Sequence, residues 1–137
     1  MINILILSHC ELTKELIKTA EVIAGRQDNL FYLDQDIRKE NLSSLQNKIS
    51  EILQKINSEK GTLILTDMLG GTPCNAAVLL TKIYNIEIIT GVNLPMILSA
   101  IFASRVSPTA KDLAAKVLAD GKKSIVDAKQ LLFEKLK

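Results

Sequence analysis

The sequence predicts an α/β fold with a central, mostly parallel sheet and helices on both faces. Short apolar runs, typical of buried strands, alternate along the 137 residues with longer segments whose apolar residues recur every three or four positions. This alternation indicates a parallel sheet, because a helix then connects each strand to the next. With 47% hydrophobic residues and no repeat or linker, residues 1–137 are predicted to form one domain.

The same patterns place each element along the chain. Strands are predicted at 2–7, 29–33, 62–66 and 86–90, with a late strand at 124–128. Helices are predicted at 12–24, 42–56, 75–83, 94–104, 110–118 and 130–137. Capping and helix-breaking residues set the boundaries. The expected helix starts are Asn41, Thr72 with Pro73, and Asn93, and the expected helix ends are Gly25 and Gly121.

Composition and charge exclude several classes of protein. The net charge of +2, from 17 basic and 15 acidic residues, is too balanced to make nucleic acid the main partner. No stretch is long and apolar enough to span a bilayer, and no basic region precedes the first apolar run as in a secretory signal. Cys10 and Cys74 form no disulfide framework and are predicted to be reduced thiols. We therefore expect a cytoplasmic protein.

His9 is the only histidine in the sequence, and it lies where the first predicted strand ends. Two other turns, at 67–73 and 91–95, also follow predicted strands and lead into helices. The carboxyl ends of parallel strands share one edge of the sheet, and ligands bind at that edge. We therefore expect Asp67 and the glycine-rich start of the next helix to lie beside His9.

This combination of residue types favours a phosphoryl group carried on histidine. A carboxylate that accepts the hydrogen of one imidazole nitrogen fixes the tautomer and leaves the other nitrogen as a nucleophile. The N–H groups at a helix start favour an anion. We predict His9 and Asp67 as catalytic residues. Gly70 and Gly71, which relax the backbone, and Thr72, which adds a hydroxyl, are predicted to bind the phosphate.

Each of these features alone has a simpler interpretation. A single histidine after a strand is as often a surface residue as a functional one, and a Gly-Gly-Thr-Pro segment is most often a tight turn. The segment is not a Walker A motif, because no lysine follows the glycines. A metal site of His9, Cys10 and Cys74, or a Cys10 nucleophile with His9 as base, are alternatives. The ligand spacing of zinc sites is absent, so no metal is predicted.

Three segments together resemble a known family. They are Ser8-His9 at the end of the first strand, Leu-Thr-Asp-Met-Leu-Gly-Gly-Thr-Pro-Cys-Asn-Ala-Ala at 65–77, and Gly-Val-Asn-Leu-Pro-Met at 91–96. At this spacing they resemble the IIA domain of the mannose (mannose/fructose/sorbose) class of the bacterial phosphoenolpyruvate-dependent sugar phosphotransferase system. The resemblance covers nearly the whole chain.

The resemblance implies a function, partners and site roles. His9 would accept a phosphoryl group from the small phosphocarrier protein HPr and pass it to a IIB subunit, which phosphorylates the sugar bound to a membrane permease. Asp67 would orient the imidazole, and Thr72 with nearby backbone amides would contact the phosphate. No metal or cofactor is implied. The family forms dimers, so the segment at 124–128 would be an antiparallel strand exchanged between subunits.

The sequence departs from the family at the two cysteines and leaves other functions open. The family usually has glycine where this chain has Cys10, and often phenylalanine where it has Cys74. A phosphocarrier subunit of a dihydroxyacetone kinase and a regulatory module that signals through phosphorylated His9 are alternatives, although the 91–96 segment favours sugar transport. Because the sequence ends at residue 137, we expect IIB to be a separate chain.

Overall fold

The computed structural model describes residues 1–33 and 39–136, and its centre is a four-stranded parallel sheet. The strands are β1 (Asn3–Leu7), β2 (Leu30–Tyr32), β3 (Thr62–Thr66) and β4 (Ile86–Ile89), in the order β2-β1-β3-β4. β1 pairs with β2 and with β3, and in the second pairing Leu7 lies opposite Thr66. The predicted α/β class and the parallel sheet are confirmed.

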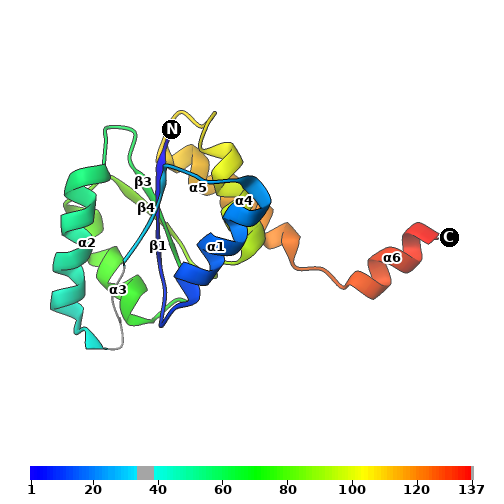
Figure 1. Cartoon of the computed structure of the whole chain (residues 1–137), viewed down its shortest axis with the longest axis horizontal. Coiled ribbons are helices and arrows are strands. Elements are labelled where there is room, and N and C mark those ends of the chain that lie inside the picture. Colours follow the sequence, from blue (N-terminus) through cyan, green and yellow to red (C-terminus); the bar gives the residue numbers. More distant parts are fainter. Residues whose placement is uncertain (34–38, 137) are drawn as a thin grey trace.

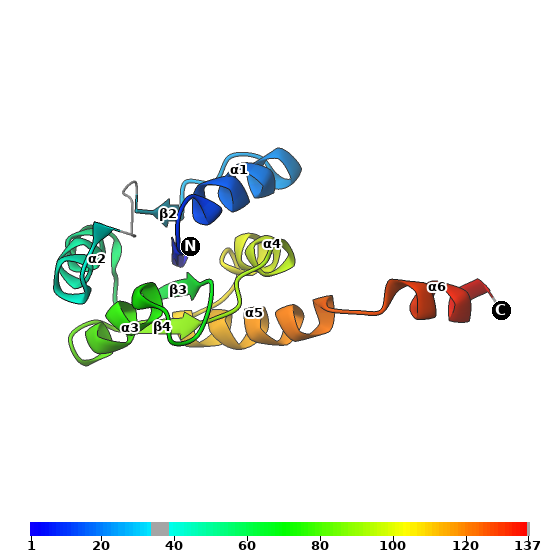
Figure 2. The same cartoon turned by 90° about the horizontal axis from the view of Figure 1, so that it is seen from below.

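Helices cover both faces of this sheet (Figure 1). The helices are α1 (Leu12–Ala24), α2 (Leu42–Ile56), α3 (Thr72–Leu79) with the short 3₁₀ turn η2 (Leu80–Lys82), α4 (Leu94–Ala103), α5 (Ala110–Ser124) and α6 (Ala128–Leu136). α2 and α3 lie on one face, and α1, α4 and α5 lie on the other, as Figure 2 shows from below.

The two faces of β1 bury different clusters, as expected for a strand covered on both sides. Ile4 and Ile6 pack with α1, α4 and α5, whereas Leu5 and Leu7 pack with α2 and α3. All four side chains are essentially inaccessible to water. Full burial of such a side chain stabilises a fold by about 1.5–3 kcal/mol. β1 is therefore held firmly between two aliphatic layers, and so is the start of the turn that follows it.

Local capping signals set most helix boundaries as predicted. Asn41 accepts a hydrogen bond from the Ser44 N–H at the start of α2, and Asn93 accepts one from the Met96 N–H at the start of α4. Gly25 follows α1 with a φ of 83°, a left-handed conformation that glycine adopts readily. Gly121 differs from its prediction, because it lies inside α5 and does not end it.

Packing between helices explains why α5 continues past Gly121. A Cβ atom added at Gly121 would lie 2.7 Å from Cγ of Met96 in α4. The glycine is therefore a close-contact residue between α4 and α5, and its missing side chain admits the neighbouring helix. From the sequence, Gly121 could either end the helix or allow a close helix contact. The close packing of α4 shows that it has the second role.

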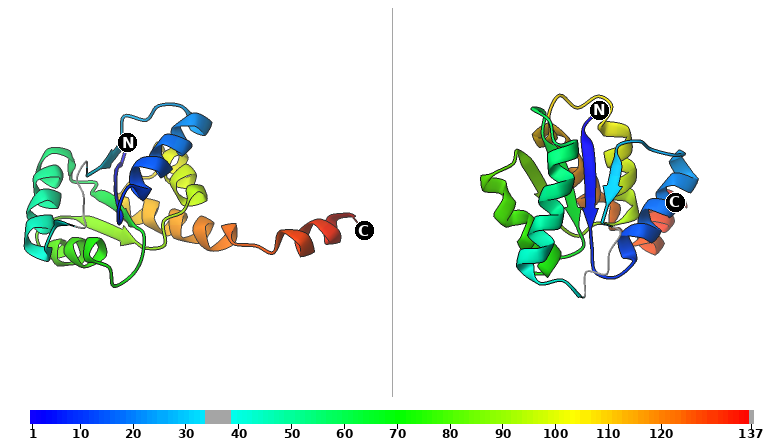
Figure 3. Two further views of the ribbon diagram at one scale, coloured as in Figure 1. Left: turned by 60° about the horizontal axis from the view of Figure 1, so that its bottom comes forward. Right: turned by 60° about the vertical axis from the view of Figure 1, so that its left-hand side comes forward.

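The predicted strand at 124–128 is wrong for the described chain. Ser124 ends α5 and Ala128 begins α6. The connecting Ile125 and Val126 are exposed, and α6 extends away from the domain (Figure 3). A strand forms only against a sheet edge, and this segment has none beside it. Exchange of the segment between two chains stays a prediction. No helix within the described residues is long and apolar enough to cross a bilayer.

Candidate active site

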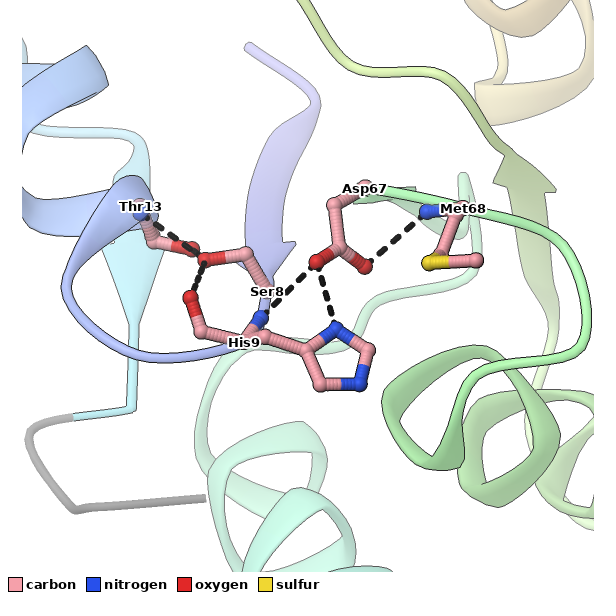
Figure 4. Close-up of polar contacts among 5 residues, drawn as sticks. All are labelled: Ser8, His9, Thr13, Asp67 and Met68. Carbon is pink, nitrogen blue, oxygen red and sulfur yellow. Dashed lines mark hydrogen bonds and ion pairs between the residues drawn. The ribbon is translucent and has the colours of Figure 1, made fainter. Parts of the chain in front are cut away.

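His9 and Asp67 meet at the carboxyl edge of the sheet, where β1 and β3 end. Nδ1 of His9 lies 2.7 Å from Oδ2 of Asp67, and the backbone N–H of His9 donates to the same oxygen at 2.9 Å (Figure 4). The two residues are 58 positions apart in sequence, and the parallel pairing of β1 with β3 brings them together. The His9 side chain is 43% exposed and the Asp67 side chain 12% exposed. The carboxylate thus holds the ring from the protein side.

This contact determines which imidazole nitrogen is available. An ionised carboxylate only accepts hydrogen bonds, so Nδ1 of His9 must carry a hydrogen and donate it to Asp67. In the neutral ring the lone pair is then on Nε2. The geometry therefore presents Nε2 as the nucleophilic atom.

Three donors keep Asp67 ionised. Its partial burial would by itself raise the pKa of the carboxyl group. The hydrogen bonds from the backbone and ring of His9, the attraction of the His9 ring and the hydrogen bond from the Met68 N–H outweigh that effect, and the pKa lies below its usual value. The Met68 N–H donates to Oδ1 at 2.9 Å, so both carboxylate oxygens are in use.

A buried serine fixes the turn that carries His9. Oγ of Ser8 accepts a hydrogen bond from the Thr13 N–H at 2.8 Å and also contacts the Thr13 hydroxyl, which ties the end of β1 to the first turn of α1 (Figure 4). Between them, Cys10 has a φ of 54°. Glycine adopts this left-handed conformation at lower cost than any residue with a side chain, so Cys10 is held in a conformation that would suit a glycine.

The start of α3 lies against the free side of the His9 ring. A Cβ atom added at Gly71 would lie 2.7 Å from Cε1 and 3.5 Å from Nε2 of His9. Gly71 is the residue before α3, and Thr72 is the first helical residue, so the prediction that Thr72 caps the helix is wrong. Within residues 1–33 and 39–136, no side chain forms a capping hydrogen bond at the start of α3. The N–H groups of Thr72 and Cys74, in the first turn of α3, therefore have no intrahelical acceptor and follow directly on the glycine that lies against the ring.

Two contributions to this site were not predicted. The Asn75 side chain donates to the Gly70 carbonyl at 3.3 Å, which holds the glycine turn to the first turn of α3. The Ser8–Thr13 contact fixes the turn on the other side. Serine and asparagine can be recognised in a sequence as residues that often stabilise turns and helix ends. Which backbone group each side chain binds, here five residues away, depends on the conformation of the folded loop.

The structure gives no support to a metal site. Among the described residues, no three histidine, cysteine, aspartate or glutamate side chains are grouped as metal ligands would be. Cys74 is buried in the first turn of α3, whereas Cys10 is exposed. What the structure does bring together is a tautomer-fixed imidazole, an ionised partner and an uncapped helix start. These are the groups needed to accept an anionic phosphoryl group on nitrogen.

The chain is similar in sequence and in fold to known proteins. Residues 3–118 match the family described as EIIA-man, PTS system fructose IIA component. The chain is 34% identical over 136 residues to the PTS system mannose-specific EIIAB component of Escherichia coli, covering 98% of this chain and 42% of that protein. The chain thus spans less than half the length of that relative.

Shorter relatives and solved structures give the same result. The PTS system fructose-specific EIIA component of Bacillus subtilis is 31% identical over 102 residues, which cover 74% of this chain and 69% of that protein. The structure of the mannose/sorbose-specific IIA subunit from Enterococcus faecalis superposes with a TM-score of 0.82 at 26% identity. The match covers 92% of this chain and 93% of that one.

Proposed function

The chain belongs to the EIIA-man family of sugar phosphotransferase IIA components, and from this premise we propose that it carries a phosphoryl group on Nε2 of His9. The observation that supports this most directly is the 2.7 Å contact between Nδ1 and Asp67, which leaves Nε2 as the nucleophile. We propose HPr as the donor and a IIB subunit as the acceptor, with the sugar phosphorylated at a membrane permease. The proposed place of action is the cytoplasm.

The proposed transfer moves one phosphoryl group between two nitrogens. The lone pair of Nε2 attacks the phosphorus of the donor's phosphohistidine and forms a new N–P bond. The old N–P bond breaks, and its electron pair returns to the donor imidazole. The hydrogen on Nδ1 of His9 stays where it is, so the phosphorylated ring gains positive charge next to Asp67. The carboxylate stabilises that charge as it develops.

The start of α3 is the proposed phosphate-binding element. The N–H groups of Thr72 and Cys74 have no intrahelical acceptor, and the helix dipole places partial positive charge at this end. Gly71 lets this turn approach the ring closely, and Gly70 is held by Asn75. In this proposal the Thr72 hydroxyl supplies a further donor to the phosphate.

Labelling with phosphoenolpyruvate tests the proposal. Incubation with ³²P-labelled phosphoenolpyruvate, enzyme I and HPr should give one phosphate per chain that is labile to acid and stable to base. The His9→Ala variant should take up none. Retention of label in that variant would overturn the assignment of His9. The labelled protein should then lose its phosphate to purified IIB. A labelled protein that never transfers to IIB would favour the alternative of a regulatory module.

A further inference from the structure

Asn75, in the first turn of α3, binds both carbonyl groups of the glycine turn beside His9. Its backbone N–H donates to the Gly71 carbonyl at 2.9 Å, and its side-chain amide donates to the Gly70 carbonyl at 3.3 Å. The first bond is part of the helix pattern and would form with any residue except proline, whereas the second requires this side chain. Asn75 is exposed, so packing in the core does not explain the side-chain contact.

The peptide between Gly70 and Gly71 can adopt two orientations. Gly70 has a φ of 85° and open space at its Cβ position, and Gly71 has a φ of −75° and a ψ of 159°. A half-turn of the peptide would bring the φ of Gly71 to about 105°, a backbone conformation that is essentially restricted to glycine. Because both flanking residues are glycines, no side chain blocks this rotation. Another interaction must therefore select one orientation.

The orientation of this peptide decides which polar group lies beside Nε2 of His9. In a trans peptide the N–H and the C=O point in opposite directions. The Asn75 amide holds the Gly70 oxygen toward α3, so the Gly71 N–H points away from that amide. A Cβ atom on Gly71 would lie 3.5 Å from Nε2, which places the peptide next to the nucleophilic nitrogen. In the opposite orientation a carbonyl oxygen would replace the N–H and repel an anion.

The Gly71 N–H is available to a ligand. It has no hydrogen-bond acceptor among residues 1–33 and 39–136. It directly precedes the N–H groups of Thr72 and Cys74, which have no intrahelical acceptor. N–H groups that are held in place before a reaction stabilise negative charge more effectively than groups that must first reorient. A fixed peptide orientation would therefore assist phosphoryl transfer, and a rotating one would not.

We propose that Asn75 is a positioning residue for phosphoryl transfer: its side-chain amide fixes the Gly70–Gly71 peptide so that the Gly71 N–H binds the phosphoryl group on His9. The proposal rests on the function proposed for His9. Asn75 acts through the glycine turn and not by contact with the phosphate. The other end of the same turn is held by the Met68 N–H, which donates to Asp67.

The Asn75→Ala variant removes the amide and keeps a good helix former in α3, so the fold should be retained. A neutral hydrogen bond of this kind shifts an equilibrium about three- to tenfold, and kcat for phosphorylation by phospho-HPr should fall by that factor. The KM for phospho-HPr should stay within about twofold of the wild-type value. Phosphoramidate, a small molecule that phosphorylates histidine directly with release of ammonia, should react more slowly by the same factor, because the defect lies beside the ring.

Asn85→Ala is the matched control. The Asn85 side chain makes the same kind of bond, to the Glu59 carbonyl at 3.1 Å, and it lies in an exposed turn before β4, at the amino edge of the sheet. This variant should leave both rates unchanged. The NMR signal of the Gly71 amide adds a measurement that stability of the turn alone would not change. Phosphorylation should shift the amide proton downfield in the wild type and in Asn85→Ala, and clearly less in Asn75→Ala.

Asn75→Ala rates within about twofold of the wild type, or a Gly71 shift equal to that of the wild type, would overturn the proposal. Slowing with phospho-HPr alone would also overturn it, because Asn75 would then act in docking. A Gly71 amide that does not shift in the phosphorylated wild type would overturn the proposal and leave the function of His9 intact. Failure of the wild type to take up phosphate from either donor would instead refute the function proposed for His9.

Discussion

Replacing Asp67 with asparagine tests the carboxylate without removing its shape. Oδ2 of Asp67 accepts from the His9 N–H and from Nδ1, and Oδ1 accepts from the Met68 N–H. An asparagine has one accepting oxygen. If that oxygen faces His9, its amide nitrogen faces the Met68 N–H, and two donors oppose each other. The variant therefore loses one hydrogen bond and also the negative charge beside the ring.

The expected magnitude follows from these contacts. A hydrogen bond to a charged group contributes about 1.5–3 kcal/mol, and the lost charge acts on the positive ring that forms during transfer. A loss of about 2–3 kcal/mol in the transition state slows a reaction about 30- to 150-fold. The Asp67→Asn variant should therefore accept the phosphoryl group from phospho-HPr about 30 to 150 times more slowly than the wild type. The Asp67→Ala variant should be at least as slow, and the His9→Ala variant should be inactive.

Rapid-quench single-turnover measurements with saturating phospho-HPr would determine this rate. Asp28→Asn is the matched control, because its carboxylate is highly exposed and lies 3.9 Å from Arg26, away from the site. Circular dichroism should show an intact fold in both variants. An Asp67→Asn rate within threefold of the wild type would refute the reasoning and reduce Asp67 to a charge near a helix start.

The same contacts predict how stability depends on pH. The hydrogen bonds from His9 and Met68 hold the pKa of Asp67 below its usual value, so the ionised carboxyl stabilises the folded state. This contribution is complete above the unfolded pKa, about 3.9, and is lost as the pH falls through the folded value. In urea unfolding, the stability difference between wild type and Asp67→Asn should therefore narrow below about pH 4. A constant difference from pH 7 to pH 3 would contradict the assignment.

Two glycine-related substitutions probe the turns around His9. Gly71→Ala places a Cβ 2.7 Å from Cε1 of His9 and should slow phosphoryl transfer at least about tenfold by displacing the ring; a transfer rate within twofold of the wild type would contradict this account. Cys10→Gly relieves a left-handed conformation that costs about 1–2 kcal/mol, offset by about 0.5–1 kcal/mol of added chain entropy. Thermal unfolding should show a gain of up to about 1 kcal/mol, and a clear loss of stability would be inconsistent with strain at Cys10.

Sequence patterns within short segments were enough to predict the fold class of this protein and the edge of the sheet at which the site lies. The alternation of apolar runs and helical segments indicated a parallel sheet, and strand ends in such a sheet share one edge. The meeting of His9 with Asp67 followed from that rule alone. Caps such as Asn41 and Asn93 were predictable because they satisfy backbone groups of their own helix.

Only the tertiary structure determines which segments that are distant in sequence come into close contact. The contact of Gly71 with the His9 ring, the two roles of Asp67 oxygens and the packing of Gly121 against Met96 all depend on which backbone comes within a few ångströms of another. The sequence alone does not distinguish a glycine that ends a helix from a glycine at which another helix packs closely. The late strand was wrongly predicted for the same reason: a strand needs a sheet edge beside it, and composition records only that Ile125 and Val126 are apolar.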